Sequence, residues 1–193
     1  MKTNIVLASS SPYRKILLEK LNIPFTTHSP NIDETPRENE SPQNLVERLA
    51  KEKASKVSKK FKKSIIIASD QVATFNDKII GKPKDEHEAY TTLLSFSEKA
   101  IVHYTSLVVL DNLQGKMACR TEPFEVLFKK LSPELVQHYI NSEKPLDCAG
   151  SVKSEGMGVM LFNHMKGRDP NSLIGLPLMA LADCFDELGV KWF

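Results

Sequence analysis

The chain has 193 residues, of which 41% are hydrophobic and 26% charged, a composition typical of one globular domain with a substantial core. Its 26 basic and 24 acidic residues leave a net charge of +2, which argues against a protein that coats nucleic acid through a large basic excess. The three widely spaced cysteines indicate neither a zinc knuckle nor a disulfide framework. No apolar run is long enough for a signal peptide or a membrane span, so we expect a single cytoplasmic domain over residues 1–193.

Apolar residues recur at strand and helix spacings along the chain, and serine–proline pairs mark helix starts, because serine caps the helix and proline fits its first turn. In the first half these patterns predict strands over residues 5–8, 25–28 and 64–73, a return strand over 78–80 after an Asn76-Asp77 turn, and helices over 12–21 and 42–61. In the second half they predict a helix over 85–97, strands over 100–110 and 117–128, a helix after Ser132-Pro133, a strand over 159–162, a loop over 167–171 and a helix over 178–188. The continuous apolar run at 64–73 is typical of a strand buried on both faces, so we expect a mixed α/β fold.

The first helix start could bind phosphate. Ser9, Ser10 and Ser11 lead into the helix, where backbone N–H groups, hydroxyls and the positive helix end come together. Arg14 lies in the first turn and could add charge-assisted hydrogen bonds to a polyphosphate. The same residues also fit a plain serine cap with solvated basic side chains, so this loop alone leaves both interpretations open.

Asp70 interrupts the apolar strand over 64–73. An ionised carboxylate at the end of such a strand is costly unless a cation pairs with it. Ligands bind at the carboxyl ends of strands in open α/β sheets, so a metal ion or a catalytic water explains this residue. The alternative is a structural aspartate that caps a turn or pairs with a lysine.

Three further charged residues could share a site with Asp70. Lys53 lies at the edge of the apolar stripe of the 42–61 helix, from which it could extend into solvent or reach the strand end. Glu34 lies in a polar loop, and Lys82 follows the return strand. Two carboxylates and two lysines beside a phosphate-binding loop fit metal-assisted phosphoryl chemistry, and hard oxygen ligands favour Mg²⁺ or Mn²⁺.

Several short motifs, in this order, resemble those of the Maf nucleotide pyrophosphatases. They are Ser9-Ser10-Ser11-Pro12-Tyr13-Arg14, Asp33-Glu34, Glu52-Lys53-Ala54, Ser69-Asp70-Gln71, Gly81-Lys82-Pro83, Ala149-Gly150 and Gly167-Arg168-Asp169-Pro170-Asn171. The resemblance implies an elongated α/β fold of the inosine-triphosphatase type, with two lobes around a central cleft and often dimeric. It also implies a metal-dependent enzyme that hydrolyses a nucleoside triphosphate to the monophosphate and pyrophosphate. Residue by residue, it implies Asp70 as general base, Glu34 and Asp70 as metal ligands, and Ser9, Arg14, Lys53 and Lys82 as triphosphate ligands.

Three positions are similar to the branch of this family that acts on 7-methyl-GTP. Tyr13, Gln71 and Glu155 stand where the branch that cleaves dTTP and UTP usually has arginine, threonine and glutamine. N7-methylation makes guanine cationic, and a tyrosine face attracts a cation by roughly 0.5–2 kcal/mol. A carboxylate at Glu155 could accept from guanine N1–H and the exocyclic amine. Without the resemblance, packing of the tyrosine and solvation of the acid would explain these residues equally well.

Two other functions stay open. One is a broader house-cleaning pyrophosphatase for other modified or pyrimidine nucleotides. The other is a nucleic-acid-binding or cell-division regulatory protein that uses the lysine-rich stretch 51–63 as its contact surface, although a near-neutral charge and the lack of a binding motif argue against it. We expect a small nucleotide substrate, no stable nucleic-acid complex and no membrane association.

Overall fold

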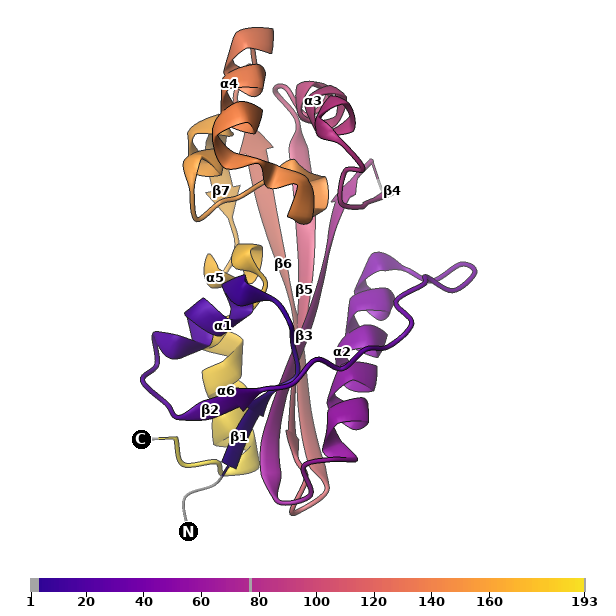
Figure 1. Ribbon diagram of the computed structural model, residues 1–193, viewed down its shortest axis with the longest axis vertical. Coiled ribbons are helices and arrows are strands. Elements are labelled where there is room, and N and C mark those ends of the chain that lie inside the picture. The colour runs from indigo at the N-terminus through magenta and orange to yellow at the C-terminus, as the bar shows by residue number, and fades with distance from the viewer. Residues whose placement is uncertain (1–3, 77, 193) are drawn as a thin grey trace. The chain divides into compact units, whose positions relative to one another are not determined.

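The computed structural model describes residues 4–76 and 78–192 and alternates helices and strands (Figure 1). The elements of the first half are β1 (Asn4–Leu7), α1 (Pro12–Glu19), β2 (Phe25–Thr27), α2 (Pro42–Ser58), β3 (Ser64–Phe75), β4 (Lys78–Ile80) and α3 (Glu86–Ser95). They are followed by β5 (Ala100–Asp111), β6 (Lys116–Phe128), α4 (Pro133–Glu143), the 3₁₀ helices η1 (Pro145–Asp147), η2 (Ala149–Ser151) and η3 (Met157–Leu161), then β7 (Phe162–Lys166), α5 (Asn171–Ile174) and α6 (Leu178–Leu188). None of the helices in the described part of the chain has the length and apolar character needed to cross a lipid bilayer.

The strands form one seven-stranded sheet in the order β2-β1-β3-β5-β6-β7, with β4 also paired to β3. β1 runs parallel to β2 and to β3, whereas β4 is antiparallel to β3 and β7 is antiparallel to β6. The pairing of β1 with β3 extends from Asn4 opposite Ser64 to Leu7 opposite Ile67. These pairings confirm the predicted mixed α/β fold, with a sheet flanked by helices.

The chain divides into two compact units; three of the divisions fall within β3, β5 and β6, and the fourth follows β7, between Gly167 and Arg168. In the described part of the chain, unit 1 comprises residues 4–71, 104–122 and 168–192, and unit 2 comprises residues 72–76, 78–103 and 123–167.

The sheet of unit 1 is buried on both faces. Side chains alternate along a strand, so Ile5 and Leu7 pack in one cluster with residues of α1 and α6, whereas Val6 and Ala8 pack in another with residues of α2. Figure 1 shows α1 and α6 on one side of these strands and α2 on the other. The start of β3 follows the same alternation, which explains why its sequence is a continuous apolar run rather than an alternating one.

Unit 2 is built around a chain of aromatic contacts. Phe75, Phe96, Phe128 and Phe162 succeed one another with ring centroids 5.2–5.3 Å apart, which joins β3, β6 and β7 to the end of α3. The hydroxyl of Tyr139 on α4 donates to the carbonyl of Ser151 and accepts from the backbone N–H of Lys153. These two bonds fix the segment 151–153 against that helix.

The strand predicted over 159–162 is wrong: η3 occupies Met157–Leu161, and β7 begins at Phe162. The carbonyl of Lys153 accepts from the N–H groups of both Gly156 and Gly158, which coils the chain before the strand starts. A Cβ at Gly158 would lie 2.3 Å from that carbonyl oxygen, so only glycine allows this turn. The apolar residues that suggested a strand belong to the 3₁₀ helix.

The loop predicted over 167–171 is confirmed up to Pro170, but the sequence missed α5, which begins at Asn171 and is too short to show an apolar period. The placement of Asp70 at a strand end needs correction. β3 does not end near Asp70 but continues to Phe75, so this carboxylate lies inside the strand. Of the predicted Asn76-Asp77 turn, Asn76 has a left-handed φ of 50°, and Asp77 lies outside the described residues.

His103 on β5 makes acid stability a test of this fold. The side chain is buried, and neither ring nitrogen has a hydrogen-bond partner among the described residues. Burial lowers the pKa of His103 to about 4 from 6.5, so the unfolded chain binds the proton more readily than the folded one. The free energy of unfolding should therefore fall as the pH drops from 6.5 to 4, by up to about 3 kcal/mol. Urea unfolding across this range should show a weaker pH dependence for His103→Leu.

The matched control for this experiment is His87→Leu, which changes an exposed histidine in the same unit. It should keep the pH dependence of the wild-type protein. An unchanged slope in His103→Leu would contradict the assignment of the acid-sensitive group.

Candidate functional site

The loop between β1 and α1 is held by its own serine hydroxyls. Ser11 is the N-cap of α1, and its Oγ accepts from the backbone N–H of Arg14 at 3.4 Å. The buried Oγ of Ser9 accepts from the backbone N–H of Ser11 at 3.1 Å. The predicted cap is therefore confirmed, and Ser9 stiffens the loop immediately beyond the carboxyl end of β1.

Lys53, Asp70 and Glu34 meet in an ion-pair cluster within unit 1. The Nζ of Lys53 lies 2.6 Å from Asp70 Oδ1 and 2.8 Å from Glu34 Oε1. Lys53 and Asp70 are each only 5% exposed, whereas the Glu34 side chain is 58% exposed. Lys53 therefore points toward β3 and not into solvent. Its ammonium brings three of the predicted site residues together.

Asp70 lies where β3 has lost its neighbour on one side. The last pair between β1 and β3 joins Leu7 and Ile67, so β3 passes Asp70 after β1 has ended. Burial raises the pKa of the Asp70 carboxyl, and the positive charges of Lys53 and Arg14 oppose the shift. The Asp70 carboxylate is therefore more basic than a solvated aspartate, although Lys53 and Arg14 lie close to it.

Arg14 connects α1 to two distant parts of unit 1. Its Nε donates to the carbonyl of Gly175 at 2.9 Å, and its Nη1 donates to the carbonyl of Ser69 at 2.7 Å. Two of the five N–H groups of the guanidinium are thereby engaged. Burial lowers the pKa of Arg14, and Asp70 and Glu34 counteract this shift, which places its charge close to the ion-pair cluster.

The loop that carries Glu34 is fastened to α2 by Arg48, a residue that the sequence did not single out. Arg48 donates from Nε and Nη2 to both carboxylate oxygens of Glu40, at 2.6 and 2.8 Å, and from Nη2 to the carbonyl of Thr35 at 3.1 Å. Arg48 also lowers the pKa of Glu40 to about 2. These hydrogen bonds of the Arg48 guanidinium fix Thr35, the residue next to Glu34. The loop is irregular, so no spacing in the sequence predicts this contact.

Two of the three predicted specificity residues belong to unit 1. Tyr13 is half-buried in the first turn of α1. The Nε2 of Gln71 donates to the carbonyls of Ser172 and Leu173, at 2.6 and 3.1 Å, and to Thr105 Oγ1 at 3.0 Å. The amide of Gln71 is therefore fixed by α5 and β5.

The other two predicted site residues belong to unit 2, and both are exposed. Lys82 follows β4, where the backbone N–H of Gly150 donates to the carbonyl of Gly81. Glu155 lies in the turn before η3. The structure therefore brings Glu34, Lys53 and Asp70 into direct contact, and it places Lys82 and Glu155 in the other unit.

The donors at the ion-pair cluster fit a hard divalent cation. No group of three His, Cys, Asp or Glu side chains suited to a metal occurs within the described ranges. Mg²⁺ is commonly held by only one or two carboxylates together with water and substrate phosphates. The two carboxylates that share Lys53 supply that number of protein ligands, from Glu34 and Asp70.

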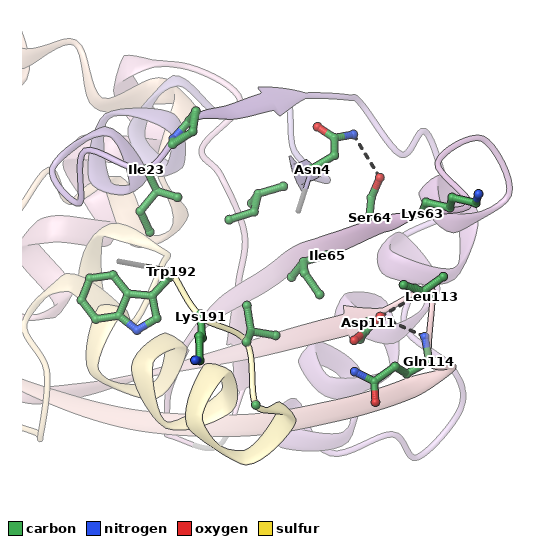
Figure 2. A pocket seen from close by; sticks show the side chains of 14 residues that line it. Asn4, Ile23, Lys63, Ser64, Ile65, Asp111, Leu113, Gln114, Lys191 and Trp192 are labelled. Atoms are coloured by element: carbon green, nitrogen blue, oxygen red, sulfur yellow. Dashed lines mark hydrogen bonds between the residues drawn. The ribbon is translucent and has the colours of Figure 1, made fainter. Parts of the chain in front are cut away.

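A separate pocket of about 830 Å³ lies at the opposite ends of β1 and β3, and it contains none of the predicted site residues (Figure 2). Asn4 and Ser64, joined by a hydrogen bond, belong to its lining, together with Trp192. Because the ion-pair cluster lies beyond the carboxyl end of β1, this pocket is distinct from it.

Comparisons with known proteins show what the chain as a whole is similar to. The family model described as "Maf-like protein" matches residues 4–188. A 7-methyl-GTP pyrophosphatase of Colwellia psychrerythraea is 50% identical over 98% of this chain and 94% of its own length. One of Pseudoalteromonas atlantica is 50% identical over 98% and 97%, and one of Vibrio parahaemolyticus is 48% identical over 97% and 96%.

Among solved structures, a HAM1 protein from Coxiella burnetii has the same fold. It is 13% identical, with a TM-score of 0.52 over 98% of this chain and all of that one. This likeness concerns the fold alone and supports the predicted inosine-triphosphatase type. On its sequence, from the first strand to the last helix, the chain belongs to the Maf family.

Proposed function

We propose that this protein hydrolyses 7-methyl-GTP to 7-methyl-GMP and pyrophosphate. The observation that carries the proposal is the buried contact of Lys53 with Asp70, with Glu34 on the same ammonium. Relatives about half identical over nearly the whole chain, named as 7-methyl-GTP pyrophosphatases, support this substrate. Such an enzyme is a hydrolase acting on an acid anhydride, and we propose that it works in the cytoplasm as a homodimer.

Asp70 acts as the general base. Its carboxylate accepts a proton from the attacking water, whose oxygen forms the new bond to the α-phosphorus. The bond from that phosphorus to the oxygen bridging to the β-phosphate breaks, and pyrophosphate leaves with the electron pair. A carboxylate whose pKa is raised by burial is a better proton acceptor than a solvated one, which suits this role.

Cationic groups bind the triphosphate. Arg14 presents a guanidinium beside the ion-pair cluster, and Ser9 belongs to the loop at the start of α1, where N–H groups favour anions. Lys53, the third proposed triphosphate ligand, contacts the carboxylates of Asp70 and Glu34 with one ammonium, at 2.6 and 2.8 Å. Lys82, from unit 2, is the fourth proposed triphosphate ligand.

Glu34 and Asp70 are the proposed ligands of a divalent metal, Mg²⁺ or Mn²⁺. When bound, such an ion neutralises phosphate charge and lowers the pKa of water. The chain's own contribution is to place the exposed Glu34 carboxylate: Lys53 contacts it directly, and Arg48 binds the carbonyl of the next residue, Thr35.

Base selection is assigned to Tyr13, Gln71 and Glu155. The face of Tyr13 favours the cationic methylated guanine, and the Glu155 carboxylate accepts from its N1–H and amine groups. Gln71 presents an amide already fixed to Ser172, so its orientation does not have to be organised when the base binds.

Substrate choice is tested with a panel of 7-methyl-GTP, GTP, dTTP, UTP and CTP, scored for both pyrophosphate and orthophosphate release. Hydrolysis should release pyrophosphate, and kcat/KM should be highest for 7-methyl-GTP. Tyr13→Ala should lose roughly 2- to 30-fold of the preference over GTP, the range of a cation–π contact. Equal turnover of all five nucleotides would contradict the proposed specificity, and release of single phosphates would contradict the reaction.

Removal of the base is tested with Asp70→Asn. Loss of proton transfer should lower kcat by roughly 10²- to 10⁴-fold. Circular dichroism and thermal unfolding should show an intact fold. Asp111→Asn is the matched control, because Asp111 is equally buried at 5% exposure but caps the turn after β5, and it should retain the wild-type rate. A near-normal rate in Asp70→Asn would exclude it as the base.

Metal activation is tested with Arg48→Met. Without the fork to Glu40 and Thr35, the loop loses its fixed position, so Glu34 should bind the metal less tightly. The Mn²⁺ concentration for half-maximal activity should rise several-fold, while kcat at saturating metal changes less. Arg37→Met is the control, since this exposed arginine reaches only Glu52 with its side chain among the described residues. Equal metal requirements in both variants would refute this role for Arg48.

A further inference from the structure

The motif Gly167-Arg168-Asp169-Pro170-Asn171 leads into α5, the short helix that the sequence did not predict. Asp169, only 1% exposed, organises this region: its Oδ1 accepts from the backbone N–H of Asn171, and its Oδ2 accepts from that of Met179 at the start of α6. Both ends of the segment are thereby fixed, and α5 ends at Gly175. Because a single helical turn has little intrinsic stability, these tertiary contacts determine where its carbonyls lie.

The carbonyls at the end of α5 accept hydrogen bonds from the side chains around the candidate site. The oxygen of Gly175 accepts from Arg14 Nε at 2.9 Å and from Ser69 Oγ at 2.7 Å. The oxygen of Ser172 accepts from Gln71 Nε2 at 2.6 Å and from Thr105 Oγ1 at 2.8 Å. Carbonyls at the end of this short helix thus hold a proposed triphosphate ligand, Arg14, and a proposed specificity residue, Gln71.

Gly175 cannot be replaced without moving Arg14. Its φ of +111° is a conformation that residues with a side chain rarely adopt. A Cβ at this position would lie 3.2 Å from Arg14 Nε and 3.7 Å from its Nη2. The flexible end of Arg14 would have to shift, and the bond to the Gly175 carbonyl would be strained or lost.

We propose that Gly175 is a positioning residue, whose carbonyl and missing side chain together aim the Arg14 guanidinium at the triphosphate. The proposal rests on the function proposed above, because that function makes Arg14 a substrate ligand. Gly175 itself does not touch the nucleotide and acts only through Arg14.

Steady-state kinetics of Gly175→Ala test this proposal. KM for the nucleotide should rise roughly 10- to 100-fold, the range for a lost hydrogen bond to a charged group, with a smaller change in kcat. Gly189→Ala is the matched control: Gly189 ends α6 with a left-handed φ of +67°, and a Cβ there would meet nothing within 4 Å. It should keep KM within about twofold. Equal increases in both variants would mean that backbone strain alone is responsible and would overturn the proposal.

A double-mutant cycle separates positioning from general damage. Gly175→Ala should have little further effect on KM once Arg14→Ala has removed the side chain it acts through, because residues that act as a unit are not additive. Additive effects would overturn the proposal.

Ser69→Ala, which leaves the backbone of Gly175 unstrained, decides the question if Gly175→Ala does not fold. It should raise KM roughly 2- to 10-fold in the wild-type background and not in Arg14→Ala, and the same rise in both would refute the coupling.

Nuclear magnetic resonance of the Arg14 Nε–H group gives a readout that does not need activity. The signal, assigned by its loss in Arg14→Lys, should exchange slowly with water in the wild-type protein and in Gly189→Ala, and faster in Gly175→Ala. An unaltered signal in Gly175→Ala would refute positioning even if activity falls. A wild-type protein that hydrolyses no nucleotide would instead refute the proposed function, while this measurement still decides whether Gly175 positions Arg14.

Discussion

The ion pair between Lys53 and Asp70 is the constraint on which the site depends. Both groups are almost fully buried, and a charge removed from water in this way is tolerated only with a partner at hydrogen-bond distance. The pair joins α2 to β3, so helix and strand must pack in one relative position for either charge to be satisfied. The exposed Glu34 also contacts the Lys53 ammonium, and Arg48 fixes the neighbouring residue, Thr35, through its carbonyl.

The position of that pair follows from the lengths of the strands. β1 stops at Leu7, whereas its parallel neighbour β3 continues to Phe75. On that side, the part of β3 between Ile67 and Ala73, where β4 begins to pair, is therefore contacted by loops and helix ends, and these bring N–H groups, hydroxyls and carbonyls to the same place. Parallel sheets bind ligands at such ends for this reason. Burial also raises the pKa of Asp70, which is the property that its proposed role as general base requires.

The sequence predicts those features whose signals are local. The apolar run before Asp70 marks a buried strand, the serine–proline pairs mark helix starts at Ser11 and Ser41, and Lys53 stands out against an apolar stripe. What it misses depends on distant or irregular contacts. Arg48 reaches Glu40 across a loop without periodicity, and α5 is one turn long, so Gly175 gave no sign of its contact with Arg14. The strand predicted over 159–162 is wrong for a similar reason. The backbone carbonyl of Lys153, and not the pattern of side chains, determines the conformation there.

The hydrogen bond from Arg14 to Gly175 spans 161 positions of the chain. At a synthesis rate of about 5–20 residues per second, a ribosome needs roughly 10–30 s to deliver the second partner after the first. Lys53 and Asp70 emerge early in that interval, but unit 1 also needs residues from 104–122 and 168–192 before it is complete. A nascent chain therefore contains Lys53 and Asp70 well before Arg14 can form its hydrogen bond to Gly175. Arg14, a proposed triphosphate ligand, is therefore positioned only at the end of translation.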